Sequence, residues 1–389
     1  MRLAYVDPRP IPDVRAMPMQ LLQTVDGLAR AGVEVTLIAP LPRNGAVVED
    51  ILGRRLHENV TWLPLFDLRK RWWFPFNTSR VFFRRAAGLL RRLRPDAVMA
   101  RHLGVADYLQ QALPDLPTFF ELHEVFADSY AANHPKPDAK QRLKLEKLER
   151  RERRVYERAK GLIGLTDELG RRGRTRYGVD TPVVTIPNGV DLVLARQALD
   201  GFDGQERDGF HVLYLGGLHP WKGVNLAVEA VAQVADAHLD VVGAGGGGDV
   251  GALKALAEKL GCADRVNLQG PVLPPARRFE VIAKADACIL PLLANPVGTS
   301  PLKLFEYLAM GKPTVMAGLP SIRELVEDGR ECLLAEAGNA PDFARALRRI
   351  SEDRVLRECL GRRGRERAGA FGWERRGERL RAFFDSVRG

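Results

Sequence analysis

The sequence predicts an α/β protein built from two domains. Short apolar segments rich in β-branched residues alternate with amphipathic helical segments. The first two apolar segments are residues 3–6 and 33–38, and the helical segment between them is 21–29. The apolar segments lack strict period-two alternation, which is typical of strands buried on both faces of a parallel sheet. A chain of 389 residues has room for two or three cores at about 150 residues per domain.

Two series of expected strands follow one another along the chain. The first is 3–6, 33–38, 97–100, 118–122 and 161–165, and the second is 211–215, 239–242, 266–268, 287–290 and 314–316. Helical patterns separate the strands, and a turn-rich polar stretch of the kind that joins domains lies between the two series. We therefore expect a first domain over residues 1–200, a second over 201–372, and a C-terminal helix over 373–389 that can pack back on the first.

Composition narrows the class of protein. The chain carries 59 basic and 49 acidic residues and is 46% hydrophobic, which is ordinary for a globular protein and excludes general disorder. Its four cysteines are widely spaced and form no Cys-x-x-Cys pair, so we expect a reduced, cytoplasmic compartment. The N-terminal apolar run is shorter than the about 7–15 residues of a signal peptide core. Because no apolar stretch approaches the roughly 18 residues of a spanning helix, any membrane contact is expected at the surface.

Two loops that join an expected strand to an expected helix suit a phosphate group. After strand 287–290, a loop of small residues and a helix N-terminus can present backbone N–H groups to an anion. Glu306, about one turn into that helix, can accept hydrogen bonds from ribose hydroxyls. The loop 216–223 places Lys222 among glycines, where its charge can stabilise a departing phosphate. Considered alone, Glu306 also fits a solvated helix position, and Lys222 a surface turn.

Taken in order, these segments resemble the retaining GT-B glycosyltransferases of family 4, the glycosyl transferases group 1, over essentially the whole chain. The matching segments are 186–191, 216–223, 243–245, 266–272, 300–306 and 309–313. The resemblance implies two Rossmann-like domains with parallel sheets that face an interdomain cleft, the first binding the acceptor and the second the nucleotide sugar. It also implies a metal-independent, hexosyltransferase-type reaction that retains the anomeric configuration and serves a lipid-linked or polysaccharide acceptor in cell-envelope or exopolysaccharide synthesis.

The resemblance assigns roles to individual residues. His123 corresponds to a histidine beside the donor sugar, Lys222 to a diphosphate-binding lysine and Glu306 to a ribose-binding carboxylate, and these three are the expected catalytic residues. The other expected donor-binding residues are Gly216, Gly217, Gly243, Val272, Leu273, Gly298, Thr299, Ser300, Pro301, Leu302 and Lys303. Considered alone, His123 also fits a strand-end histidine with a structural hydrogen bond. Glu121 and Glu124 are minor candidates for acceptor contacts.

The chain departs from the family pattern at two donor positions. Gly298 stands where the E-x(7)-E motif has its first glutamate, and Gly217 stands where an arginine commonly precedes the lysine. Lys303 or Arg323 can compensate for these changes. The departures leave two alternatives open. One is a GT-B scaffold or pseudo-enzyme that binds sugar nucleotides, and the other is a sugar-nucleotide epimerase on the same fold.

No cofactor is expected beyond the nucleotide sugar as a co-substrate. Residues 243–248 satisfy the dinucleotide pattern G-x-G-x-x-G, but they follow the second strand of their series rather than the first, which argues against a nicotinamide enzyme. The chain contains no Asp-x-Asp or His-Glu-x-x-His motif and no cysteine cluster, so no metal is expected.

Residues 66–95 combine basic and aromatic side chains. This combination favours the headgroup region of an anionic membrane, where each basic residue contributes about 1 kcal/mol. We expect contact with the inner face of the plasma membrane through Arg69, Lys70, Arg71, Trp72, Trp73, Arg84 and Arg85. The alternative is an amphipathic helix that faces the core and leaves its arginines solvated. No nucleic-acid partner is expected, because no binding-module motif accompanies the charge.

Overall fold

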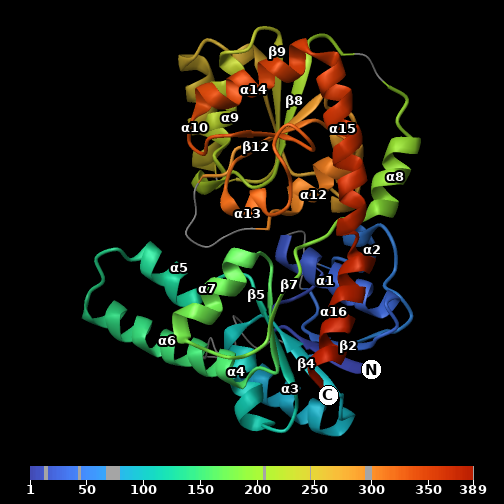
Figure 1. Cartoon of the computed structure of the whole chain (residues 1–389), viewed down its shortest axis with the longest axis vertical. Coiled ribbons are helices and arrows are strands. Elements are labelled where there is room, and N and C mark those ends of the chain that lie inside the picture. Colours follow the sequence, from blue (N-terminus) through green and yellow to red (C-terminus); the bar gives the residue numbers. More distant parts are fainter. Residues whose placement is uncertain are drawn as a thin grey trace. The chain divides into compact units, whose positions relative to one another are not determined.

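The computed structural model describes residues 1–12, 16–42, 45–66, 79–204, 207–245, 247–293 and 300–388, which form two compact units (Figure 1). Among these residues, unit 1 comprises those up to 188 together with 373–388, and unit 2 comprises 189–293 and 300–372. Residues 189–200, assigned to the first domain by the sequence analysis, belong to unit 2, because Val190 and Ala195 lie in its core.

Unit 1 is built on a parallel sheet that has seven strands in the described part of the chain, in the order β3-β2-β1-β4-β5-β6-β7. The strands are β1 (Arg2–Val6), β2 (Glu34–Ala39), β3 (Val60–Pro64), β4 (Ala97–Ala100), β5 (Thr118–Leu122), β6 (Gly161–Gly164) and β7 (Val183–Thr185). The direction in which strands are added reverses between β1 and β4. Ligands of open α/β sheets bind at the carboxyl ends of the strands beside such a reversal.

Helices cover both faces of this sheet (Figure 1). They are α1 (Ala16–Arg30), α2 (Val48–Leu52), α3 (Arg80–Leu93), α4 (Leu103–Ala112), α5 (Phe126–Asn133), α6 (Ala139–Arg158), α7 (Asp167–Tyr177) and α16 (Trp373–Arg388). Apolar residues of α3, α4, α6 and α7 share one core with the strands. The C-terminal helix α16 crosses α1 closely, since a Cβ atom on Gly377 would lie 2.0 Å from the carbonyl oxygen of Gly27.

Unit 2 contains a second parallel sheet, with six strands among the described residues, in the order β10-β9-β8-β11-β12-β13. The strands are β8 (Phe210–Leu215), β9 (Ala237–Val242), β10 (Val266–Gln269), β11 (Ala287–Leu290), β12 (Thr314–Ala317) and β13 (Leu333–Ala335). The helices are α8 (Leu192–Asp200), α9 (Val224–Ala232), α10 (Gly247–Lys259), α11 (Arg278–Ala283), α12 (Leu302–Ala309), α13 (Pro320–Arg323), α14 (Ala340–Glu352) and α15 (Arg354–Ala368). The reversal lies between β8 and β11, and the predicted α/β class with two parallel sheets is confirmed.

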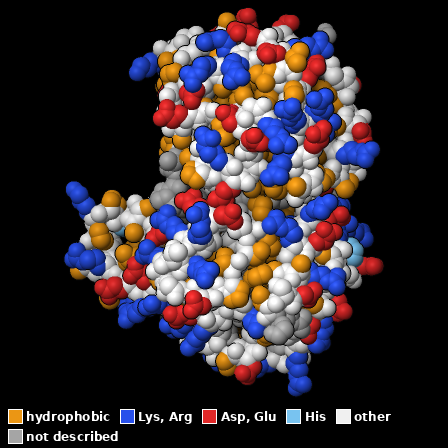
Figure 2. All heavy atoms as spheres, in the orientation of Figure 1, with side chains coloured by type: hydrophobic (Ala, Val, Ile, Leu, Met, Phe, Trp, Pro, Cys, Tyr) orange, Lys and Arg blue, Asp and Glu red, His pale blue; other side chains and the backbone are white. Residues whose placement is uncertain are grey.

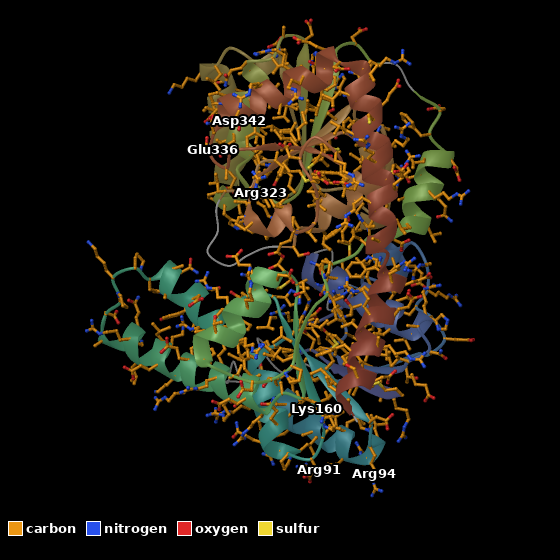
Figure 3. The ribbon with its side chains drawn as sticks, in the orientation of Figure 1. Arg91, Arg94, Lys160, Arg323, Glu336 and Asp342 are labelled. Carbon is orange, nitrogen blue, oxygen red and sulfur yellow. The ribbon has the colours of Figure 1, made fainter. Side chains whose placement is uncertain are left out.

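The helix α3 has a sharply divided surface. Its buried face consists of Phe82, Phe83, Ala86, Ala87 and Leu90, and every exposed position on it is an arginine: Arg80, Arg84, Arg85, Arg91 and Arg92. Arg91 and Arg94 mark its C-terminal end in Figure 3. By contrast, basic and acidic side chains are interspersed over the face of the molecule drawn in Figure 2.

These observations bear on the expected membrane segment. Phe82 and Phe83 belong to the core, as the alternative of a core-facing helix requires. Arg84 and Arg85 are exposed, whereas Arg69, Lys70, Arg71, Trp72 and Trp73 lie outside the described residues. Among the residues that the structure describes, no helix has both the length and the apolar character needed to cross a membrane.

Candidate functional site

Two loops meet at the reversal point of the unit 2 sheet. One follows β8 and contains Gly216 to Gly223, and the other follows β11 and leads to α12. The backbone N–H of Leu293 donates to the carbonyl of Trp221 at 3.1 Å. Gly223 has φ of +66° and lies so close to the second loop that a Cβ atom would be 1.9 Å from the carbonyl oxygen of Pro291. The expected phosphate-binding loops are therefore in direct backbone contact.

The turn after β9 packs against the same first loop. The N–H of Leu218 donates to the carbonyl of Ala244 at 3.1 Å. A Cβ atom on Gly243 would lie 1.7 Å from the carbonyl oxygen of Gly216, so only glycine fits there. The hydroxyl of Tyr214 donates to the carbonyl of Gly217 at 2.6 Å. These contacts bring Gly216, Gly217 and Gly243 together at one end of the sheet.

Lys222 is a half-buried cation at this end of the sheet. Its Nζ lies 3.9 Å from the centre of the Trp221 ring. Among the described residues no carboxylate forms an ion pair with Lys222, and the carboxylate of Glu306 is paired with Arg278 and Lys303 instead. Burial, together with the nearby Lys303 ammonium, lowers the pKa of Lys222 to about 8. A cation with a lowered pKa gains stability when an anion is placed beside it. Lys222 is thus suited to a phosphate ligand.

Glu306 lies on α12, 3% exposed, and is held by two cations. Arg278 of α11 donates from Nε to Oε1 at 2.7 Å, and Lys303 donates from Nζ to Oε2 at 2.5 Å. Burial alone would raise the pKa of Glu306, but Lys303 and Arg278 hold it below its usual range. Each carboxylate oxygen has two lone-pair sites, so Glu306 keeps acceptor capacity for hydroxyl groups.

The helix α12 is fixed to the sheet by its buried face. Leu304, Phe305 and Leu308 lie in the core of unit 2, and the Tyr307 hydroxyl accepts a hydrogen bond from the N–H of Leu215 at 2.9 Å. Because Leu215 is the last residue of β8, this bond sets the position of α12 relative to the Lys222 loop. Lys222, Lys303 and Arg278 outnumber the single carboxylate of Glu306, which leaves an excess of positive charge for a diphosphate.

The remaining expected donor residues are distributed around this cluster. Ser300 is buried, Pro301 precedes α12 as its N-cap, and Leu302 begins the helix. Val272 and Leu273 follow β10, two strands from β8, and the Leu273 side chain is 63% exposed. Gly298 and Thr299 lie outside the described residues, so the departure at position 298 has no structural counterpart here.

His123 belongs to unit 1, directly after β5. Its Nε2 lies 3.1 Å from Oε2 of Glu121, and its side chain is 21% exposed. Burial lowers the pKa of His123 even though Glu121 acts to raise it. A lowered pKa favours the neutral imidazole, which can act as a hydrogen-bond donor or acceptor to a sugar hydroxyl.

The sequence analysis missed three arginines that hold site carboxylates. Arg278 lies 28 residues from Glu306, Arg101 lies 94 residues from Asp7, and Arg376 lies 255 residues from Glu121. No local motif connects partners so far apart in sequence. A buried Glu306 on an otherwise apolar helix face was the one available signal, because such a carboxylate needs a cationic partner.

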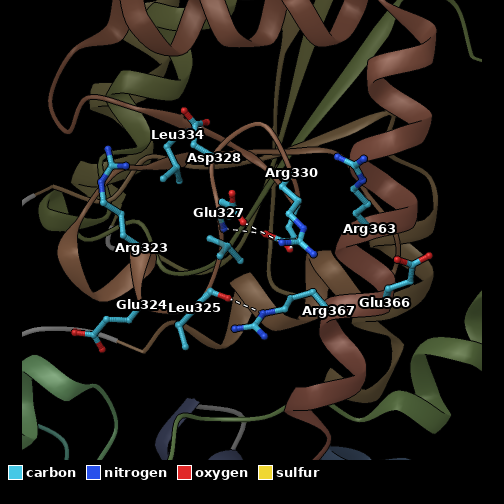
Figure 4. Close-up of a pocket in the computed structure, with 12 residues that line it drawn as sticks. Arg323, Glu324, Leu325, Glu327, Asp328, Arg330, Leu334, Arg363, Glu366 and Arg367 are labelled. Carbon is cyan, nitrogen blue, oxygen red and sulfur yellow. Dashed lines mark hydrogen bonds and ion pairs between the residues drawn. The ribbon is translucent and has the colours of Figure 1, made fainter.

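A cavity of about 750 Å³ lies in another part of unit 2 (Figure 4). Its lining is charged and partly paired internally, since Arg330 contacts Glu327 and Glu331, and Arg367 donates to the carbonyl of Leu325. Arg323, expected to compensate for Gly217 or Gly298, lines this cavity and donates to the carbonyl of Gly318. Among the described residues no group of three or more His, Cys, Asp and Glu side chains is arranged to hold a metal ion.

The class of fold is defined by two parallel sheets, each with helices on both faces. In each sheet the strand order reverses at one point, where ligands of open α/β sheets bind. Sucrose-phosphate synthase from Thermosynechococcus elongatus superposes with a TM-score of 0.79 at 20% identity, over 99% of this chain and 98% of that chain. The Anabaena protein HepE in complex with UDP-glucose gives 0.72 at 17% identity, over 99% and 100%. WaaG, a glycosyltransferase involved in lipopolysaccharide biosynthesis, gives 0.70 at 16% identity, over 98% and 99%. The chain has the GT-B fold.

The sequence comparisons identify the family within this fold. Residues 19–194 match Glycosyltransferase Family 4, and residues 209–353 match Glycosyl transferases group 1. D-inositol 3-phosphate glycosyltransferases of Paenarthrobacter aurescens and Geodermatophilus obscurus are 27% and 32% identical over 58% and 61% of this chain. The aligned part spans 57% and 54% of those relatives, just over half of their length. The chain belongs to the group 1 glycosyltransferases, which confirms the predicted family.

Proposed function

We propose that this protein transfers a sugar from a nucleoside diphosphate sugar to a hydroxyl group of an acceptor. The observation that carries the proposal is Lys222, a half-buried cation with a pKa lowered to about 8 at the reversal point of the unit 2 sheet. Its neighbour Lys303 adds positive charge, and Glu306 offers acceptor sites for a ribose. This combination fits a nucleoside diphosphate better than any neutral ligand.

In the proposed reaction the bond between the anomeric carbon and the phosphate oxygen breaks as the bond to the acceptor oxygen forms on the same face. The acceptor proton passes to a phosphate oxygen, and the configuration at the anomeric carbon is retained. Lys222 and Lys303 stabilise the negative charge that develops on the departing diphosphate. His123 is the proposed neutral partner of a donor-sugar hydroxyl. These cations supply the charge for which other enzymes use a metal, so we propose that the transfer is metal-independent.

The relatives support a hexose donor. HepE was solved with UDP and with UDP-glucose, and the sequence relatives are D-inositol 3-phosphate glycosyltransferases. We propose a nucleoside diphosphate hexose as donor and a lipid-linked or polysaccharide acceptor, in synthesis of the cell envelope or an exopolysaccharide. We propose that the reaction takes place in the cytoplasm, because nucleotide sugars are used there.

We further propose that the protein binds the inner face of the plasma membrane through α3. Its exposed positions are all arginines, and each basic residue near an anionic surface contributes about 1 kcal/mol. The membrane would place a lipid-linked acceptor within reach of unit 1.

The test is to incubate the protein with UDP-, GDP-, ADP- and dTDP-hexoses and to measure released nucleoside diphosphate and any glycosylated product by mass spectrometry, with EDTA throughout. We expect turnover of one donor that depends on an acceptor and is lost in Lys222→Met. Binding without turnover would favour the pseudo-enzyme, and an altered sugar formed without an acceptor would favour the epimerase.

A further inference from the structure

Four charged side chains are buried together at the carboxyl end of the unit 1 sheet. Asp7 follows β1, Arg101 follows β4, Glu121 lies near the end of β5, and Arg376 comes from α16. None is more than 3% exposed. Burying ionised groups is costly unless each is paired and hydrogen-bonded, so a cluster of this kind needs a specific arrangement of partners.

Glu121 is the centre of this cluster. Its Oε1 accepts hydrogen bonds from Arg376 and, at 3.1 Å, from the Gln20 amide. Its Oε2 accepts from the Tyr5 hydroxyl at 3.0 Å and lies 3.1 Å from Nε2 of His123. The carboxylate is thus fixed from several sides, and one of its oxygens faces the histidine.

Two further contacts hold the partners of Glu121 in place. Arg101 forms an ion pair with Asp7 at 3.0 Å and donates to Oε1 of Gln20 at 2.6 Å, which turns the Gln20 amide nitrogen toward Glu121. Arg376 also donates to the carbonyls of Ile186 and Pro187, the segment that follows β7. Arg376 of the C-terminal helix is therefore linked to His123 through the carboxylate of Glu121.

We propose that Glu121 is a positioning residue that orients His123, and that Arg376 of the C-terminal helix holds Glu121 in this place. The proposal rests on the proposed function, because it assigns His123 its place beside the donor sugar. It makes α16, which has no residue in the expected donor site, a determinant of that site.

The charged groups around Glu121 and His123 determine whether the pKa of His123 should rise or fall when the charge of Glu121 is removed. Glu121 is faced by His123 from its own strand end, by Arg376 from α16, by Arg101 from the end of β4, and by the Tyr5 hydroxyl from β1. Asp7, which follows β1, faces Arg101. Burial would raise the pKa of Glu121, but His123 and Arg376 hold it far below its usual range. Burial lowers the pKa of His123, and the charges of Arg101 and Arg376 lower it as well, whereas Glu121 raises it. Removing the charge of Glu121 should therefore lower the pKa of His123 further.

The experiment is an NMR titration of the histidine side chains in the full chain, with the His123 signal assigned by its loss in His123→Gln. In Glu121→Gln we expect the His123 midpoint to fall by about one pH unit, the effect of removing an opposite charge at this distance. Asp26→Asn is the matched control, because Asp26 is equally buried and paired with Arg30 and Arg54 but does not face His123. An unchanged midpoint in Glu121→Gln, or an equal fall in the control, would overturn the proposal.

Kinetics supply the second readout. We expect Glu121→Gln to lower kcat at least tenfold while the Kd for the free nucleoside diphosphate, which binds unit 2, stays within twofold. Arg376→Lys should retain more of kcat than Arg376→Met. If Glu121→Gln does not fold, the double variant Glu121→Gln/Arg376→Met, which removes both charges, takes its place in the kinetic measurement. Should the native protein transfer no sugar, the proposed function fails, while the titration still decides whether Glu121 controls His123.

Discussion

Burial disfavours the charge of Lys222 in the ligand-free protein, and an anionic ligand beside it would stabilise that charge. Because the described residues give it no carboxylate partner, replacing it should cost the ligand-free protein little. We expect Lys222→Met to change the free energy of unfolding by no more than about 1 kcal/mol, the value of the lost contact with Trp221, and to abolish stabilisation by nucleoside diphosphates. Urea denaturation with and without ligand measures both, and Lys254→Met on the exposed face of α10 is the control. A large loss of stability without ligand would assign Lys222 a structural role.

The pH dependence of binding follows from the same residue. The pKa of Lys222 is about 8, so its charge is lost as the pH rises through that value. A bound diphosphate favours the charged form, and the affinity must therefore fall at higher pH. We expect the Kd for a nucleoside diphosphate to be flat near pH 7 and to rise toward about tenfold per pH unit above pH 8. Calorimetry from pH 6.5 to 9.5 measures it, and a rise of the same size in Lys222→Met would assign the effect to another group.

At the scale of elements, the contact between the turns after β8 and β9 depends on the absence of a side chain at Gly243. A Cβ atom there would lie 1.7 Å from a backbone oxygen, so the two turns must separate. We expect Gly243→Ala to destabilise unit 2 by about 1–3 kcal/mol and to weaken nucleotide binding. The control is Gly251→Ala in α10, where nothing lies within 4 Å and alanine should add about 0.5–1 kcal/mol of stability. Equal stabilities for the two variants would contradict the packing described here.

The arginine face of α3 gives a prediction about surfaces. Arg84→Glu combined with Arg85→Glu should lower binding to vesicles that contain anionic lipid by about tenfold or more, since each basic residue contributes about 1 kcal/mol. The melting temperature should not change, because both side chains are exposed. Lys254→Glu combined with Lys259→Glu on α10 makes the same change of charge in unit 2, and this control should bind vesicles more tightly than the α3 variant does. Sedimentation with vesicles that contain anionic lipid measures the binding of both variants. An equal loss of binding in the two variants would contradict the prediction.

Most of the strands that could be predicted from sequence are central and buried on both faces; β10, expected at 266–268, is the exception at a sheet edge. The expected strands 3–6 and 211–215 correspond to β1 and β8, whose continuous apolar runs mark central parallel strands. The strands β3, β7 and β13 were not anticipated, and all three lie at sheet edges. Edge strands are short or partly exposed, so their sequences lack the continuous apolar run that marks a central strand. Likewise Lys222 and Glu306 stand in local motifs, whereas Arg278 and Arg376 reach the site only through the tertiary fold.

At the scale of the whole molecule, two units of similar topology place different chemistry at equivalent points. The reversal point of unit 1 gathers Asp7, Arg101, Glu121 and His123, a set in which each carboxylate has a basic side chain beside it. The reversal point of unit 2 gathers cations in excess around Glu306. Unit 2 is thus suited to the charged nucleotide, and unit 1 to hydroxyl groups of a sugar or an acceptor. This division follows from the residues at the strand ends and not from the fold they share.

The most direct test of this account is calorimetric titration of the native protein with UDP, GDP, ADP and dTDP in the presence of EDTA, repeated on Lys222→Met and Glu306→Gln. We predict that one nucleoside diphosphate binds the native protein, that Lys222→Met weakens it at least 100-fold, and that Glu306→Gln weakens the diphosphate more than it weakens inorganic pyrophosphate. If no nucleoside diphosphate binds, or if binding survives in both variants, the assignment of a nucleotide site to the reversal point of unit 2 is contradicted.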